Sequence, residues 1–173
     1  MNGHTKIKVI KPIDPAATYD VAREIENFCR EFAVSDKEHA LVIALEGNAY
    51  LLYGAARGIN PKIIGEEFLS GSIIAHNHPL EFAGQGDSFS RDDLVFAARY
   101  ETGKQYLVAG TRRNAFEFTR PLSVNEVYAA WRKAEMQMLW KVASKEMDVI
   151  WRQEEILKIL GKSLKGFEFY DKF

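Results

Sequence analysis

The sequence has one cysteine, almost no net charge and no long apolar run. A single cysteine excludes an internal disulfide, so nothing points to an oxidising compartment. A formal net charge of −1 gives neither nucleic acid nor an anionic membrane a surface that would attract it. Because no segment approaches about 18 consecutive apolar residues, no transmembrane helix is expected.

Residues 1–6 also lack the apolar stretch of a signal peptide. Together with the other absences, this predicts a cytoplasmic protein that binds no membrane and is not expected to bind nucleic acid. The composition, 47% hydrophobic and 27% charged, is ordinary for a globular protein, and 173 residues fit a single domain.

Alternating strand and helix patterns predict an α/β fold, in which a mixed β-sheet is sandwiched by helices. A helix is expected over residues 18–33, where Cys29 shares the apolar face and is read as a small buried hydrophobe. Residues 1–17 fit either a short strand or an extended arm. The remaining expected strands are 39–45, 49–54, 72–75, 105–109 and 115–119, and the expected helices are 61–68 and 90–100.

Residues 123–160 contain neither proline nor glycine and predict a long C-terminal helix, or two helices with a break, ended by Gly161 as C-cap. An unbroken helix would be about 57 Å long at 1.5 Å per residue. It must therefore fold back over the core, or project and offer its apolar stripe to a partner protein or a second copy. The expected domain has a core at about 18–121 and a helical extension at about 123–162.

Two histidines stand one residue apart at the end of the expected strand 72–75. In an extended chain His76 and His78 point to the same side, and Pro79 keeps His78 extended. Two imidazoles need further ligands for an open zinc site, and Asp93 offers a carboxylate from the first turn of the next helix. Asp92 lies about 100° away around that helix and is expected to be solvated.

Ser90 and Asp93 also have a purely structural explanation. A serine followed three residues later by an acid is the pattern that caps a helix N-terminus. Both explanations can hold at once, because Ser90 can cap the helix while Asp93 turns inward to a metal ion.

The string His76-x-His78-Pro79 followed by Ser90-x-x-Asp93 resembles the JAMM signature of the JAB/MPN zinc metallopeptidases. The sequence His-Asn-His-Pro is similar to the RadC-like bacterial branch, and residues 88–94 resemble JAB domains of phage-related and polymorphic proteins. The resemblance spans about residues 38–121 and implies a JAB/MPN, cytidine-deaminase-like fold. Segment 79–89 is longer than its counterpart in the family, which removes any basis for transferring substrate contacts from that loop.

The resemblance also implies an upstream glutamate before the first core strand, and Glu38 matches it. The rival, Glu46, lies at the other end of that strand, about 26 Å away at 3.3 Å per residue, so only one of the two can be at the site. His39 would then face the opposite side of the strand and be structural.

In the family's chemistry, zinc held by His76, His78 and Asp93 activates water, Glu38 transfers the proton, and Ser90 binds the oxyanion. The implied reaction is hydrolysis of a peptide or isopeptide bond, with the C-terminus of a ubiquitin-like protein as one substrate class. A phage- or toxin-associated peptidase and a catalytically silent JAB scaffold are the alternatives. A RadC-like role near DNA has little support from the balanced charge.

Overall fold

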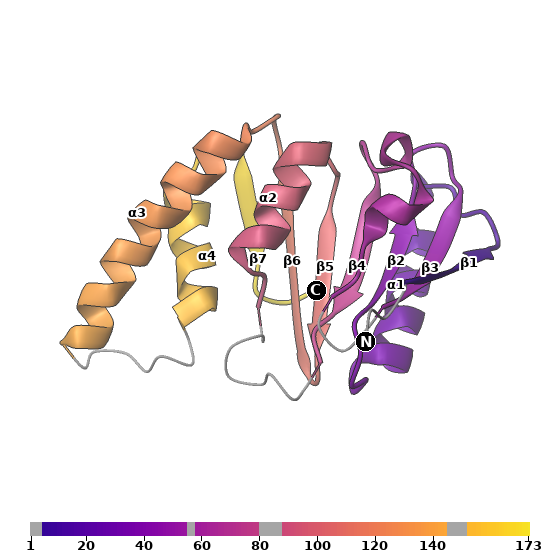
Figure 1. The fold of residues 1–173 in the computed structure, drawn as a ribbon, viewed down its shortest axis with the longest axis horizontal. Coiled ribbons are helices and arrows are strands. Elements are labelled where there is room, and N and C mark those ends of the chain that lie inside the picture. Colours follow the sequence, from indigo (N-terminus) through magenta and orange to yellow (C-terminus); the bar gives the residue numbers. More distant parts are fainter. Residues whose placement is uncertain (1–4, 55–57, 80–87, 145–151) are drawn as a thin grey trace.

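The computed structural model describes residues 5–54, 58–79, 88–144 and 152–173, and within them the chain forms one seven-stranded mixed sheet (Figure 1). The order across the sheet is β1-β3-β2-β4-β5-β6-β7, and β4 and β5 are the described pair that runs parallel. The strands are β1 (Lys6–Ile10), β2 (His39–Ile43), β3 (Ala49–Tyr53), β4 (Ile73–Asn77), β5 (Gln105–Ala109), β6 (Arg112–Phe118) and β7 (Phe167–Tyr170).

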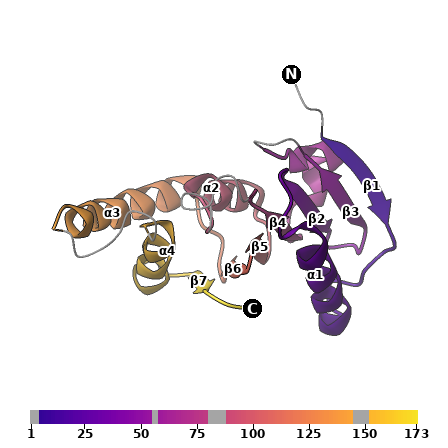
Figure 2. The same ribbon diagram turned by 90° about the horizontal axis from the view of Figure 1, so that it is seen from below.

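Helices cover both faces of the sheet, as the sequence predicted. Figure 2 looks across the sheet and separates α1 on one side from α2 and α3 on the other. The helices are α1 (Thr18–Phe32), α2 (Arg91–Tyr100), α3 (Val124–Ala143) and α4 (Arg152–Ser163), with 3-10 turns η1 (Pro61–Ile64) and η2 (Glu66–Phe68). No helix in the described ranges has both the length and the apolarity needed to cross a bilayer.

The alternation of side chains along the strands divides the core into two sides. On β5, Val108 packs into the cluster under α1, whereas its neighbour Leu107 packs into the cluster formed with α2, α3 and α4. The α1 cluster includes the predicted apolar face of that helix, Val21, Ile25, Phe28, Cys29 and Phe32. Cys29 is therefore a buried core residue, as expected.

The C-terminal region folds back. Trp131 and Met138 of α3 share one apolar cluster with Leu157 and Leu160 of α4, so two helices pack side by side (Figure 1). The connection itself falls outside the described residues. The prediction that Gly161 caps the helix is wrong, because Gly161 lies inside α4, which continues to Ser163.

Three further details differ from the sequence-based expectation. Residues 61–68 form two 3-10 turns, since Gly65 between them has φ +106°, a conformation incompatible with a continuous helix. Helix α2 ends at Tyr100, as predicted, but Glu101 and not a glycine takes the left-handed conformation (φ 50°) that closes it. Strand β7 was not predicted, and residues 6–10, left open between strand and arm, form β1.

Candidate metal centre

Strand β4 delivers His76 and His78 to the side of the sheet that α2 covers. His76 pairs with Ala40 on β2, is 7% exposed, and contacts the fully buried ring of Phe89 edge-on. The backbone N–H of His78 donates to the carbonyl of Val108 at 3.0 Å, which holds the chain extended beyond the end of β4. Because alternate residues of an extended chain face the same way, both imidazoles lie on one side, with ring centroids 5.1 Å apart.

Helix α2 delivers Asp93 through the capping arrangement that the sequence suggested. The N–H and hydroxyl of Ser90 both donate to Asp93 Oδ2, at 2.6 and 2.7 Å, and the N–H of Asp93 donates to Ser90 Oγ at 3.3 Å. Asp93 Oδ1 meanwhile lies 3.5 Å from His76 Nε2. One carboxylate therefore caps the helix through Oδ2 and faces His76 through Oδ1, while His78 Nε2 lies 3.9 Å from Oδ2. Asp92 is solvated as predicted, its side chain 81% exposed.

The three side chains form a group that could hold a metal ion. Candidate ligand atoms of His76, His78 and Asp93 all lie within 4.8 Å of one another. Ligand atoms bound at 2.0–2.1 Å to a tetrahedral ion stand about 3.4 Å apart, so only small side-chain movements would complete the coordination. His76 Nε2 is buried and, among the residues that the structure describes, has no hydrogen-bond partner. A buried nitrogen without a partner is costly, and a metal ion would satisfy it.

The electrostatics favour the protonation states that metal ligands need. Burial lowers the pKa of His76 to about 4, against the opposing effect of Asp93, so this imidazole is neutral at neutral pH. Burial acts to raise the pKa of Asp93, but His76, His78 and the hydrogen bonds from Ser90 outweigh it and lower that pKa. A neutral imidazole and an ionised carboxylate are the forms that bind metal.

Glu38 lies beside this group, directly before β2. It is two residues from Ala40, the partner of His76, and therefore faces the same side of the sheet. Its carboxylate accepts the backbone N–H of Ile59. Burial raises the pKa of Glu38; Asp93 also raises it, while His78 and the Ile59 hydrogen bond lower it. Glu38 is therefore close enough to His78 and Asp93 for their charges to shift its pKa.

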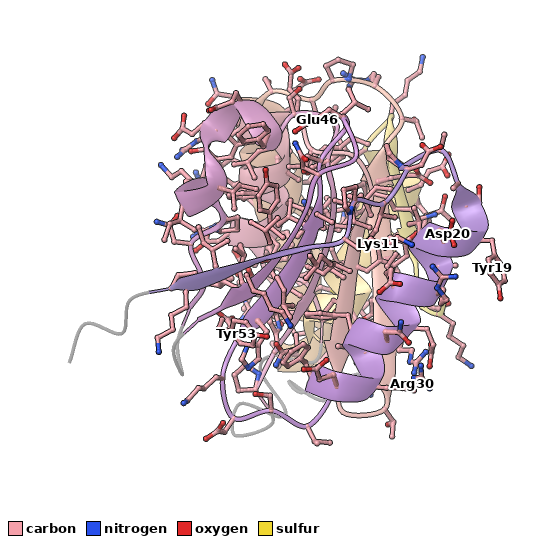
Figure 3. The ribbon with its side chains drawn as sticks, turned by 90° about the vertical axis from the view of Figure 1, so that its right-hand side faces the viewer. Lys11, Tyr19, Asp20, Arg30, Glu46 and Tyr53 are labelled. Atoms are coloured by element: carbon pink, nitrogen blue, oxygen red, sulfur yellow. The ribbon has the colours of Figure 1, made fainter. Side chains whose placement is uncertain are left out.

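Glu46, the rival glutamate, is remote from this group. Figure 3 shows Glu46 and Tyr53 toward opposite ends of the sheet, and Tyr53 pairs with His39, the residue next to Glu38. Glu46 instead accepts a hydrogen bond from Asn48 in the exposed turn between β2 and β3. The structure thus brings together Glu38, His76, His78, Ser90 and Asp93, and leaves Glu46 apart.

His39 faces the other side of the strand, as expected, and contacts the α1 cluster through Phe32. Its ring lies 4.3 Å from that of Phe32, and its Nε2 lies 3.0 Å from Ser35 Oγ. Two contributors to the site were missed from the sequence: Ile59, which holds the Glu38 carboxylate, and Asn77, which bonds the chain on both sides of Glu38. For Asn77, its place between the two histidines was the one feature of the sequence that could have indicated a role at the site.

The long segment after His78 contributes its two ends to this description: Pro79 and Phe89 are buried, while residues 80–87 lie outside the described ranges. Comparison with known proteins adds no assignment, because no family model, no curated protein and no solved structure matches the chain.

Proposed function

We propose that the chain is a zinc-dependent metallopeptidase of JAB/MPN type that hydrolyses a peptide or isopeptide bond. The observation that carries the proposal is the convergence of His76, His78 and Asp93 within 4.8 Å, beside a glutamate that shares their electrostatic environment. Two imidazoles and a carboxylate are a ligand set that zinc uses in catalytic sites, with the fourth position left to water or substrate.

Each protein group has a distinct task in such a reaction. A zinc ion held there would supply Lewis-acid activation of a water molecule, lowering the pKa of that water toward about 7. Glu38 would take the proton from the water and deliver it to the leaving amine, and its raised pKa suits a group that must both accept and release a proton. The N–H of Ile59 fixes the carboxylate during both steps.

Ser90 stays a candidate for binding the developing oxyanion. In the structure its hydroxyl donates to Asp93 Oδ2 at 2.7 Å, so this role requires the hydroxyl to turn away from Asp93. The observed hydrogen bond supports a second task, which is to orient Asp93 so that Oδ1 faces the metal position.

The substrate class follows from the JAMM-like signature alone. A peptide or isopeptide bond after the C-terminal tail of a ubiquitin-like protein is the substrate we propose, in a bacterial pathway that processes or removes such modifiers. A peptidase associated with a phage or a toxin would use the same residues on a different protein.

The test begins with metal analysis of the purified protein and then uses ubiquitin-like proteins fused through their C-termini to a reporter. We expect one zinc per chain in the wild type and none in His78→Ala. Glu38→Gln should keep its zinc but cleave about 10²–10⁴-fold more slowly, because it removes only the proton transfer. Glu46→Gln is the matched control, since the same change at the far end of β2 should alter neither property. A wild-type protein without stoichiometric zinc would refute the proposal.

One observation favours the second candidate, a scaffold that keeps the fold without turnover. Helix α3 exposes a group of large apolar side chains: Trp140 is 75% exposed, Met136 52% and Leu139 45%. Clustered exposed apolar side chains mark partner surfaces. A protein that self-associates or captures a partner through α3, and that has no zinc and no cleavage activity, would fit this reading.

A further inference from the structure

Asn77 stands between the two candidate histidine ligands and is completely buried. Its Oδ1 accepts the backbone N–H of His39 at 2.7 Å, and its Nδ2 donates to the carbonyl of Lys37 at 2.9 Å. These two backbone groups flank Glu38 on either side. One side chain on β4 therefore holds the chain both before and after the glutamate.

The Asn77 side-chain amide takes over where the backbone hydrogen bonds between β2 and β4 end. The described pairs between β2 and β4 run from Ile43 and Ile73 to Ala40 and His76, and the segment that carries Glu38 lies just beyond the last pair. An asparagine side chain carries one carbonyl and one N–H₂ group, the same donor and acceptor as a peptide group. It replaces the missing ladder bonds at the point where Glu38 must be placed.

The carboxylate end of Glu38 is fixed separately, by the N–H of Ile59. Hydrogen bonds thus tie the backbone on either side of Glu38 to β4, the strand that leads to His76 and His78. A separate hydrogen bond ties the Glu38 side chain to the segment that follows β3. Without the Asn77 hydrogen bonds the chain around Glu38 would lose its link to β4. It would keep the hydrogen bond from the Gly54 N–H to the Glu38 carbonyl, at 2.8 Å, and the one from the Ile59 N–H to the carboxylate.

We propose that Asn77 is a positioning residue that sets the distance between Glu38 and the metal ligands, an inference that rests on the proposed peptidase function. Because the side-chain hydrogen bonds of Asn77 within the described residues go to the chain around Glu38, its loss should displace the proton-transfer group and leave the metal ligands in place. A misplacement of about 1 Å in a reacting group can lower a rate about 100-fold.

The test compares Asn77→Ser with Asn114→Ser. Asn114 on β6 is also a buried asparagine of the sheet, 3% exposed, and its Nδ2 donates to the carbonyl of Asp171, which follows β7 at the edge of the sheet away from β2 and Glu38. Both variants lose a buried amide. We expect Asn77→Ser to keep one zinc per chain, to exchange the His39 amide proton faster, and to cleave the reporter fusion with kcat lowered about 10- to 100-fold at similar KM. Asn114→Ser should keep the wild-type kcat.

A double variant separates positioning from general structural damage. If Asn77 acts through Glu38, then Asn77→Ser combined with Glu38→Gln should be no slower than Glu38→Gln alone, because the group being positioned is already gone. Additive losses would show that Asn77 acts elsewhere. Loss of zinc in Asn77→Ser would overturn the inference as well, since Asn77 would then support the ligands and not the glutamate.

The failure of this inference can be told apart from that of the proposed function. A wild-type protein without zinc or cleavage activity refutes both. An active wild type with an equally active Asn77→Ser refutes only the positioning role. If Asn77→Ser does not fold, Asn77→Asp takes its place: it keeps the acceptor for His39, loses the donor to Lys37, and should have a lowered kcat with zinc retained. A wild-type kcat in Asn77→Asp would count against the inference.

Discussion

Replacing Asp93 with asparagine should abolish stabilisation by zinc and leave the zinc-free protein almost as stable as the wild type. Asp93 has two separable tasks: Oδ2 accepts two hydrogen bonds from Ser90, and Oδ1 lies 3.5 Å from His76 Nε2. The carbonyl oxygen of an asparagine can still accept the hydrogen bonds from Ser90. Its N–H₂ group, which would then face His76 in place of Oδ1, cannot ligate a metal ion.

The two effects have different sizes. Replacing a charged acceptor by a neutral one at the helix cap should lower the free energy of unfolding by about 0.5–1 kcal/mol. A ligand that binds only the folded state, at a free concentration 100 times its Kd, raises that free energy by about 2.7 kcal/mol. For a protein of this size the zinc effect corresponds to a rise in Tm of about 5–10 °C.

The measurement is thermal unfolding of each variant with a chelator and with zinc. Ser123→Ala is the control, because it removes the equivalent capping box that Ser123 forms with Glu126 at the start of α3, and so costs about 1 kcal/mol in both conditions but leaves the zinc increment in place. A zinc increment in Asp93→Asn equal to that of the wild type would refute the assignment of Asp93 as a ligand. The absence of any increment in the wild type would refute the metal site itself.

Two further predictions concern charged groups elsewhere in the sheet. Burial lowers the pKa of His39 below its usual value of 6.5, so the unfolded chain binds a proton more readily than the folded one, and the free energy of unfolding should fall as the pH drops below 6.5. Urea unfolding between pH 7.5 and 5 should show a smaller loss of stability in His39→Phe than in the wild type, and an equal loss would contradict the reasoning. Glu117 and Glu168 stand directly opposite each other on β6 and β7, and both lie 2.6 Å from the single hydroxyl of Tyr170. Glu168→Gln should therefore raise the free energy of unfolding by a few tenths of a kcal/mol, measured by urea unfolding, and a decrease would count against like-charge repulsion.

Much of the fold was predictable because local patterns and tertiary packing agree. The apolar face of α1 and the buried run of β2 are both visible in the sequence and both end in the core. The errors occur where one residue type is compatible with two local conformations. Glycine at 161 fits a helix end as well as a helix interior, and the turn after α4 instead contains Gly166 with φ +92°. The four-residue strand β7 is too short to show a period.

The candidate site likewise contains residues that the sequence predicted and contacts that it did not. His76, His78, Ser90 and Asp93 lie close enough in sequence for their spacing to predict a shared position. The contacts of Asn77 cross from β4 to the chain before β2, and the contact between Ile59 and Glu38 depends on the path of the chain after β3. No local pattern encodes such contacts, since they exist only once the sheet has assembled.

The parallel pair β4 and β5 is joined through α2, and all three candidate ligands lie within the first part of that single connection, between positions 76 and 93. A metal ion bound there would tie the end of β4 to the start of α2 and close a short loop. Unlike a disulfide, which persists when a protein unfolds, this link would exist only in the folded chain, so the stability it adds would depend on the free zinc concentration. A chain with one cysteine cannot form an internal disulfide, so in this protein the same ion would cross-link the crossover connection and complete the site.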